Sequence, residues 1–270
     1  AHISSLEKEL NARLFVRNTK EVKLSDDGKD LYRYARQMID LQKKIEERFE
    51  TGKEESKHLI TIAASTIPAQ YLLPKILMKF NERYPKEQVK LLETDSSQVV
   101  TQIIDHMVDV GFTGTVLEKK HCKYIPFYKD ELVVITPNTE KYQKLLEDMP
   151  DDISWIGGEH LIMREEGSGT RKEAGKQLRA AGINLDKLKI IASIENQETI
   201  KKSVRQGMGI SVISRLAAED EVKYGDILAF PIPKADQGRD INLVYNKNYQ
   251  MSKSTERFVK IVKEIYGIEE

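Results

Sequence analysis

The sequence has a single cysteine, Cys122, among its 270 residues. One cysteine cannot form a disulfide within the chain, so a disulfide-stabilised secreted scaffold is excluded, and a reducing compartment, the cytoplasm, is expected. Long apolar runs are also missing. No run approaches the ~20 residues that a membrane-spanning helix needs, and no stretch has the pattern of a secretory signal. We therefore expect no membrane partner.

An excess of one charge is absent as well. The 43 lysines and arginines balance the 43 aspartates and glutamates, so a nucleic-acid surface has to be a local patch. The 5 histidines are scattered, and His121 beside Cys122 has no second pair at the spacing of a metal site, so we expect no metal and no other cofactor. Ser168 lacks a nearby base in the sequence and the pattern of a nucleophile elbow. The sequence therefore predicts no catalytic site and no enzyme.

The stretch from Leu161 to Leu178 carries the clearest local signal in the chain. Apolar residues typical of a buried strand lead into the small polar residues 167–170, and a helix with Ala174 and Leu178 on one face follows. Such a helix start directs backbone N–H groups and the positive end of the helix dipole towards an anion. The alternative is that Ser168 or Thr170 simply caps its own helix.

Small polar residues also follow three other predicted strands, at Ser65-Thr66, Ser96-Ser97 and Asn196-Gln197. Ligands of α/β sheets bind beyond the carboxyl ends of strands, so four such junctions on one rim would form a pocket for a small anion, with charge added by Arg171. Four ordinary helix caps are the alternative, and we favour the pocket. The residues predicted to bind the anion are Ser65, Thr66, Ser96, Ser97, Thr113, Gly167, Ser168, Thr170, Arg171 and Asn196.

The first 25 residues have the pattern of a short helix followed by a basic hairpin. Apolar residues recur at helical spacing over residues 2–10, and residues 14–17 and 21–24 are typical of two short strands. This combination indicates the wing of a DNA-binding domain, and a solvated hairpin is the alternative. The side chains predicted to face phosphates are Arg17, Lys20 and Lys23.

A long helix is predicted over residues 25–50, with Ser25 as its cap. One face carries apolar residues with a seven-residue repeat, and the other faces are charged. Such a narrow stripe favours pairing with a second copy of the helix, and packing on its own domain is the alternative. The stripe consists of Leu31, Tyr34, Met38, Leu41 and Ile45. The polar residues 51–57 are predicted to form a hinge.

From residue 59 onwards, predicted strands alternate with predicted helices. The helix capped by Asp95 is expected to bury Val99, Ile103 and Met107. Repeated strand–loop–helix units predict mostly parallel sheets covered on both sides. The strands are predicted at residues 59–64, 89–93, 108–113, 131–136, 161–163, 189–194, 210–213 and 241–245.

Motifs along nearly the whole chain resemble those of the LysR-type transcriptional regulators. The most specific signature is N-terminal and comprises Ile3, Leu6, Glu7, Leu10, Leu14, Phe15 and Arg17, then Leu24, Ser25, Gly28 and Leu31. Further matches are Leu72-Leu73-Pro74, Phe80 with Tyr84-Pro85, Asp109 to Phe112, Glu131 to Val134, and Val204 with Gly207, Gly209 and Ile210. Asn11, Ser25 and His106 depart from the family pattern, which usually has Gly, Thr and Gly there.

The resemblance implies an α/β fold: a two-lobed, periplasmic-binding-protein-like effector domain preceded by a partial winged helix-turn-helix and a long linker helix. The implied parts are a DNA-binding unit at 1–25, a dimerising helix and hinge at 26–57, lobe I at 58–136, lobe II at 137–237, and a return to lobe I at 238–270. The family's recognition helix begins before Ala1, so the N-terminal domain is expected to be incomplete. His2, Ser4 and Ser5 are then what is left of its base-reading face.

The resemblance also implies a function. A homodimer or homotetramer would sense a metabolite and control transcription of metabolic genes through operator DNA, with RNA polymerase as a candidate partner. The loop from Glu166 to Arg171 is similar to that of the subgroup controlling sulfur or carbon assimilation, so the resemblance implies a small anionic effector. Two alternatives share the fold: a solute-binding protein of the transport type, against which the hairpin and long helix argue, and an enzyme, which needs a catalytic group in the cleft.

Overall fold

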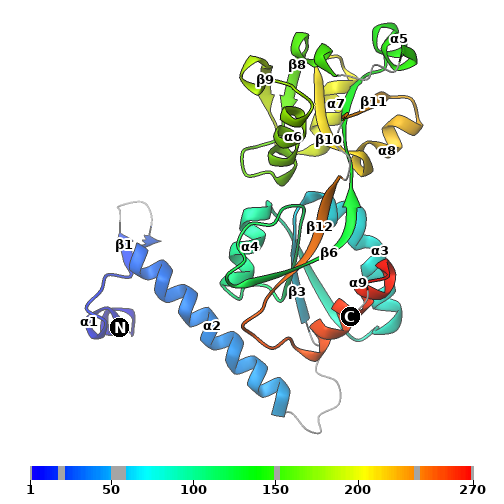
Figure 1. Cartoon of the computed structure of the whole chain (residues 1–270). Coiled ribbons are helices and arrows are strands. Elements are labelled where there is room, and N and C mark those ends of the chain that lie inside the picture. Colours follow the sequence, from blue (N-terminus) through cyan, green and yellow to red (C-terminus); the bar gives the residue numbers. More distant parts are fainter. Residues whose placement is uncertain (1, 18–21, 50–58, 149–152, 234–237, 269–270) are drawn as a thin grey trace.

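The computed structural model describes residues 2–17, 22–49, 59–148, 153–233 and 238–268. The described residues form an N-terminal helix and hairpin, a long helix, and two α/β lobes of which one lies above the other in Figure 1. The predicted fold class is therefore confirmed. The polar hinge predicted at 51–57 lies outside the described residues.

The N-terminal unit is held together by residues of the sequence signature. The Glu7 carboxylate accepts hydrogen bonds from the N–H groups of Leu14, at 2.8 Å, and Phe15, at 3.3 Å. The Ser25 hydroxyl donates to the carbonyl of Arg13 and accepts from the N–H of Gly28 at 2.9 Å, which caps the long helix. The elements are α1 (His2–Glu9), β1 (Phe15–Arg17), β2 (Val22–Leu24) and α2 (Asp26–Phe49).

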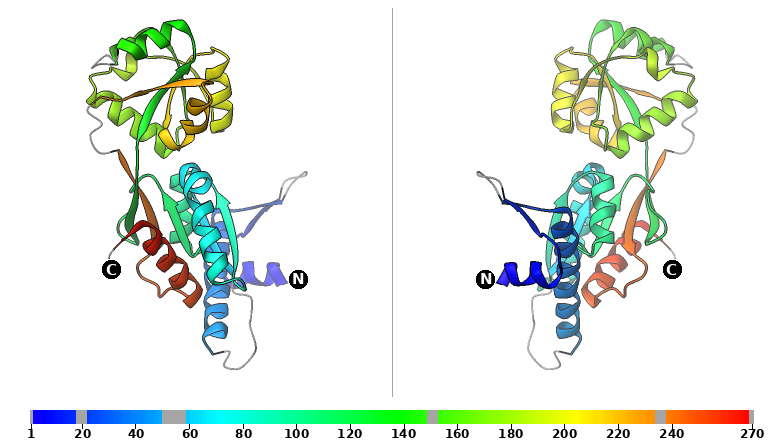
Figure 2. Two further views of the ribbon diagram at one scale, coloured as in Figure 1. Left: turned by 90° about the vertical axis from the view of Figure 1, so that its right-hand side faces the viewer. Right: turned by 90° about the vertical axis from the view of Figure 1, so that its left-hand side faces the viewer.

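The long helix α2 leaves its apolar stripe uncovered. Four stripe residues are more than half exposed: Tyr34, Met38, Leu41 and Ile45, at 56%, 73%, 54% and 51%. Both views of Figure 2 show α2 running alongside the lower lobe. There the Arg33 Nε atom lies 3.9 Å from a carboxylate oxygen of Asp105. The stripe is thus open to a partner even though α2 touches its own lobe.

Lobe I is built on a mixed sheet with the strand order β4-β3-β5-β12-β6. β3 pairs in parallel with β4 and β5, whereas β12 runs antiparallel to both β5 and β6. Its elements are β3 (Leu59–Ala64), the π-helix η1 (Pro68–Leu72), α3 (Leu73–Arg83), β4 (Gln88–Glu93), α4 (Ser96–Ile104), β5 (Val110–Thr113), β6 (Cys122–Asp130), β12 (Arg239–Asn246) and α9 (Lys253–Tyr266).

Lobe II repeats the design with the strand order β11-β7-β10-β8-β9. β8 pairs in parallel with β9 and β10, and β7 is antiparallel to β10 and β11. Its elements are β7 (Leu132–Pro137), α5 (Glu140–Asp148), the 3-10 helix η2 (Ser154–Gly158), β8 (His160–Met163), α6 (Gly169–Ala180), the 3-10 helix η3 (Leu185–Lys187), β9 (Lys189–Ser193), α7 (Gln197–Arg205), β10 (Ile210–Ser214), α8 (Arg215–Lys223) and β11 (Ile227–Pro231).

Three sequence predictions about the lobes need correction. The sheets are not mostly parallel: within the described residues of the two lobes, four strand pairs are parallel and four are antiparallel. The strand starting near residue 131 belongs to lobe II, so the first crossing lies at Glu131 and not at residue 136. Met107 is 44% exposed because α4 ends at Ile104, before the turn that would bring Met107 inwards. The predicted second boundary at residue 237 lies outside the described residues.

A buried ion pair fixes the place where the chain passes between the lobes. Asp130, the last residue of β6, is 1% exposed, and Arg239 begins β12 with a side chain that is 5% exposed. The guanidinium donates to one Asp130 oxygen from Nε at 2.9 Å and from Nη2 at 2.8 Å. The Ser214 hydroxyl, from lobe II, donates to the other oxygen. Asp130 therefore joins both strands of the crossing to lobe II.

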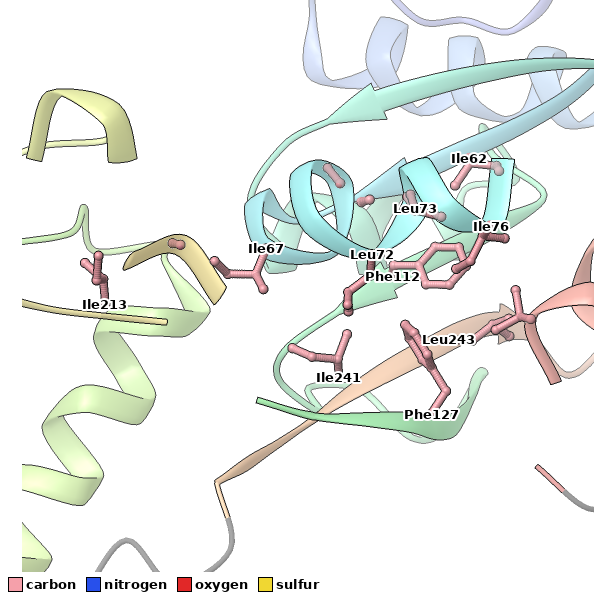
Figure 3. Close-up of a cluster of buried hydrophobic side chains, with 14 of the residues drawn as sticks. Ile62, Ile67, Leu72, Leu73, Ile76, Phe112, Phe127, Ile213, Ile241 and Leu243 are labelled. Carbon is pink, nitrogen blue, oxygen red and sulfur yellow. The ribbon is translucent and has the colours of Figure 1, made fainter. Parts of the chain in front are cut away.

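The buried apolar core continues from lobe I into lobe II. One cluster includes Ile62 and Phe112 of lobe I together with Ile162 and Ile213 of lobe II. Figure 3 shows Ile67, just before η1, projecting towards the segment that carries Ile213. Ile67 is 2% exposed. Buried apolar side chains therefore lie between the lobes, next to the ends of β3 and β10.

Replacing Asp130 by asparagine tests the crossing. D130N keeps the shape of the side chain but leaves the buried Arg239 charge uncompensated, which costs about 3–5 kcal/mol of unfolding free energy. The matched control is E131Q, which breaks the neighbouring pair of Glu131 and Arg215, whose side chains are 64% and 54% exposed. The control should cost less than about 1 kcal/mol. Urea unfolding measures both, and equal losses would contradict the role given to Asp130.

Candidate functional site

A small pocket lies between the two lobes. We call it the interlobe pocket. Residues of lobe I and lobe II face each other across it, at the carboxyl ends of β3, β4 and β8 and at the start of β12. Its lining consists of Ser65, Thr66, Ile67, Thr94, Asp95, Ser96, Arg239, Arg164, Glu165, Ser168, Gly169 and Thr170. The side chains that line the pocket are thus mainly polar, with Ile67 as the apolar exception.

Three helical starts converge on this pocket. Ser65 and Thr66 precede η1, Asp95 caps α4, and Ser168 caps α6. The Asp95 carboxylate accepts hydrogen bonds from the N–H groups of Ser97, at 2.8 Å, and Gln98, at 3.0 Å. Asp95 and Ser168 each cap a helix and line the pocket at the same time. The two interpretations of these junctions are therefore compatible, because one side chain serves both.

Five of the predicted anion-binding residues lie in this lining: Ser65, Thr66, Ser96, Ser168 and Thr170. The structure does not place the other five there. Thr113 is fully buried, with its hydroxyl donating to the carbonyl of Thr115 at 2.9 Å. Ser97 and Gly167 are exposed beside the pocket. Asn196 is exposed after the outermost strand of lobe II, and its side chain caps α7 by accepting from Thr199 N–H at 2.9 Å.

Arg171 was predicted to bind the anion, but it does not belong to the pocket lining. Its guanidinium donates to the carbonyl oxygen of Arg164 at 2.9 Å and to the hydroxyl of Ser193 at 3.4 Å. The Ser193 hydroxyl also donates to the Arg164 carbonyl, at 3.3 Å. Arg171 therefore braces the backbone of the pocket loop instead of supplying charge to the pocket.

Arg164 is the cation that sequence analysis missed. Its side chain is 5% exposed and forms a two-point pair with Glu165, with Nε–Oε2 at 2.8 Å and Nη2–Oε1 at 2.9 Å. The same Nη2 atom reaches across the pocket to the Thr66 hydroxyl of lobe I, at 3.4 Å. Its position directly after a predicted buried strand was a signal in the sequence, because that is where ligands of α/β sheets bind.

Arg239 is the second missed cation. It is 75 residues away from Arg164 along the chain, and only the return of β12 to lobe I brings it to the pocket. Its guanidinium lies close to Gly114, where an added Cβ would stand 3.2 Å from Cζ. Because it also pairs with Asp130, Arg239 belongs both to the crossing and to the pocket.

The predicted DNA-contacting residues belong to the N-terminal unit. His2, Ser4 and Ser5 are exposed on α1, and Lys23 is exposed on β2. The side chain of Arg17 and the whole of Lys20 lie outside the described residues. Within the part of the chain that the structure describes, no group of three or more His, Cys, Asp and Glu side chains is placed to hold a metal ion. None of the described helices combines the length and apolarity needed to span a bilayer.

Two mixed α/β lobes joined by two crossing strands, with a polar pocket between them, define a ligand-binding domain. A family model described as the LysR substrate binding domain matches residues 53–266. The chain belongs to the LysR-type transcriptional regulators, and the predicted family is confirmed.

Relatives carry the same kind of description. An uncharacterized HTH-type transcriptional regulator of Methanocaldococcus jannaschii is 30% identical over 98% of this chain and 88% of its own length. A probable RuBisCO transcriptional regulator of Cyanidium caldarium is 25% identical, over 96% of this chain and 81% of its own. Both relatives are described as transcriptional regulators, the class of protein that the sequence predicts for this chain.

Solved structures share the fold. The regulatory domain of CcmR from Synechocystis, in complex with 2-PG, matches with a TM-score of 0.68 and 23% identity, over 77% of this chain and 97% of that one. The effector binding domain of QuiR, in complex with shikimate, also has a TM-score of 0.68, with 16% identity over 78% of this chain and 98% of that one.

Gly169 sets how closely the lobes approach at the pocket. A Cβ on this lobe II residue would lie 2.7 Å from Oγ1 of Thr115 and 3.0 Å from Oγ of Ser96, both in lobe I. G169A should therefore push the lobes apart and cost about 1–3 kcal/mol of unfolding free energy, despite the better helix propensity of alanine. In G167A, by contrast, the Cβ meets Asp95 at an ordinary 3.5 Å.

Thermal unfolding and small-angle scattering of the two glycine variants test this contact. G169A should unfold at a lower temperature and have a larger radius of gyration than G167A. Identical behaviour of the two variants would show that a Cβ at residue 169 does not force the lobes apart.

Proposed function

We propose that the chain is a DNA-binding transcriptional regulator whose interlobe pocket senses a small anionic metabolite and thereby controls metabolic genes. The observation that carries this proposal is Arg164, a guanidinium buried at the pocket with a hydrogen bond to the opposite lobe. Buried guanidinium groups in ligand pockets are the usual partners of carboxylates and phosphates.

The surroundings of Arg164 support an anion. The start of α6 at Ser168 directs its dipole towards the pocket, and the hydroxyls of Ser65, Thr66, Ser96 and Thr170 provide donors. One of the two acids in the lining, Asp95, is already bonded to N–H groups of its own helix. The ligands named for the CcmR and QuiR structures belong to those proteins, and they support a small ligand here by analogy.

A ligand between the lobes would act on their arrangement. Thr66 and Ser96 belong to lobe I, whereas Arg164 and Ser168 belong to lobe II. A ligand that contacts both sets favours the state in which they are close together, so its binding energy shifts the balance between lobe arrangements. The α2 helix touches lobe I through Arg33 and Asp105, at the far end of the helix that begins at the pocket.

The N-terminal unit is proposed to contact operator DNA. It presents His2, Ser4 and Ser5 on α1 and the basic hairpin with Arg17, Lys20 and Lys23. The parts proposed from the sequence are a DNA-binding unit at 1–25 and a dimerising linker at 26–57, followed by the lobes, with the first lobe boundary moved to residue 131. Operator DNA, a second copy of the chain and RNA polymerase are the proposed macromolecular partners.

Two other functions fit the fold less well. A transport-type solute-binding protein has no use for a long helix with an exposed apolar stripe or for a basic hairpin. An enzyme needs a catalytic group in the cleft, and the acids there are each engaged with a donor, Glu165 with Arg164 and Asp95 with backbone N–H groups. The names of the relatives, which are those of transcriptional regulators, also favour gene regulation over these two functions.

A panel of anions tests the effector class. Sulfite, sulfate, thiosulfate, phosphate and small carboxylates are screened by thermal shift, because a ligand at ~100 times its Kd adds ~2.7 kcal/mol of stability. The best anion is then titrated by calorimetry. T66A and S168A should each weaken its binding about tenfold, since each removes a hydrogen bond to a charged group. S97A, which removes an exposed hydroxyl outside the lining, is the control, and equal affinities in all variants would contradict the site.

The oligomer is tested separately on α2. Met38 is 73% exposed in the apolar stripe, so M38E should place a charge in the seam between two copies and shift the chain to monomers. M78E changes a methionine that is 58% exposed on α3, outside the stripe, and should leave the oligomer intact. Sedimentation velocity measures both. A dimer that survives M38E unchanged would rule out α2 pairing.

A further inference from the structure

The interlobe pocket contains two carboxylates although the proposed effector is an anion. Asp95 accepts hydrogen bonds from two N–H groups of its own helix. Glu165 has a different partner, the guanidinium of Arg164. Arg239, the second arginine of the lining, is already paired with the buried Asp130. An incoming anion therefore enters a site whose positive charge is already matched.

The pair formed by Arg164 and Glu165 has the geometry with which arginine binds oxyanions. Two N–H groups of one guanidinium edge meet two oxygens of one carboxylate, at 2.8 and 2.9 Å. This parallel, two-point arrangement is the one that a ligand carboxylate, phosphate or sulfate also adopts. Glu165 thus takes up the hydrogen-bonding edge that such a ligand needs.

The two members of the pair are held unequally. The Arg164 side chain is 5% exposed, its backbone carbonyl is tied to Arg171 and Ser193, and its Nη2 also reaches Thr66. The Glu165 side chain is 23% exposed and lines the pocket. Displacement of the pair would therefore move the glutamate into solvent, while the guanidinium stays buried in place.

We propose that Glu165 is an internal competitor of the effector, a carboxylate of the chain itself that occupies Arg164 until an external oxyanion displaces it. This inference rests on the proposed function of the interlobe pocket. It names the effector as an anion with two oxygens that can bind one guanidinium edge, and it makes Glu165 the residue that sets the affinity threshold. Weak or single-point anions such as chloride do not displace a two-point carboxylate.

The physical reason is the cost of an unpaired buried charge. Without an acid at residue 165, the Arg164 guanidinium lies buried without a counter-charge, and binding an anion from solution relieves that cost. With Glu165 present, the same binding first has to break an existing charge-assisted pair. Glu165 therefore stabilises the ligand-free protein and lowers its affinity for the effector. A lower affinity suits a sensor that responds only above a set metabolite level.

The test compares E165Q with E166Q, using inorganic phosphate and sulfate as the probes. Both variants remove one negative charge from the same loop, but Glu166 is exposed and does not belong to the lining. Calorimetry at constant ionic strength should give about tenfold tighter phosphate and sulfate binding for E165Q than for wild type, as expected for the loss of one competing charged hydrogen-bond pair. E166Q should bind as wild type does.

Two further variants extend the test, and the first of them, E165D, keeps the inference testable if E165Q is unstable. E165D retains the charge but shortens the side chain, so it should pair less well and bind phosphate with an affinity between those of wild type and E165Q. The double variant R164K/E165Q keeps the positive charge but removes the planar two-point edge, so the gain of E165Q should disappear.

The outcomes separate the inference from the proposed function. If wild type binds phosphate or sulfate and E165Q binds no more tightly than E166Q, or more weakly, Glu165 does not compete and the inference is overturned while the anion pocket stands. If neither probe nor any anion of the panel binds to wild type, E166Q or E165Q, the proposed anion pocket itself is wrong, and the inference falls with it.

Discussion

The arrangement of the molecule depends on one buried ion pair, between Asp130 and Arg239. A carboxylate that is 1% exposed holds the first residue of the returning strand and, through Ser214, the end of a lobe II strand. Such a pair is costly to break but contributes little net stability when intact, so its effect is to specify one geometry. That geometry places Arg239 against Gly114 and in the pocket.

Charge in the pocket is arranged in matched pairs. The chain as a whole is neutral, and the same balance recurs locally, where each acid of the lining has a donor of its own. This is how buried charges are tolerated without a ligand. If Glu165 competes with the effector as proposed, ligand recognition is an exchange of partners for Arg164 rather than the pairing of a free charge. The hydrogen bonds from Arg171 and Ser193 to the Arg164 carbonyl hold the backbone of this residue.

Much of the secondary structure was predictable because the sequence patterns of strands and helix caps involve residues close together in the chain. Ser25, Asp95, Ser168, Asn196 and their helices follow from short-range patterns. The strands β6 and β11 and the helices α5 and α8 were not predicted. In β6 the burial pattern does not alternate, and Pro126 interrupts it, as an edge strand allows. The residues of β7 are buried throughout, so their pattern predicts a core strand but not the sheet that contains it.

The sequence by itself determined the family, the cap residues and the hydroxyls that line the pocket, because each depends on residues close together in the chain. It also indicated the exposed stripe of α2, since helical periodicity alone brings those residues to one face. Tertiary structure alone decided that Arg239 joins Arg164 at one pocket, and that Arg171 and Asn196 lie outside its lining. Those placements depend on strand order and on where the chain crosses between lobes, and contacts between distant residues leave no periodic signal in the sequence.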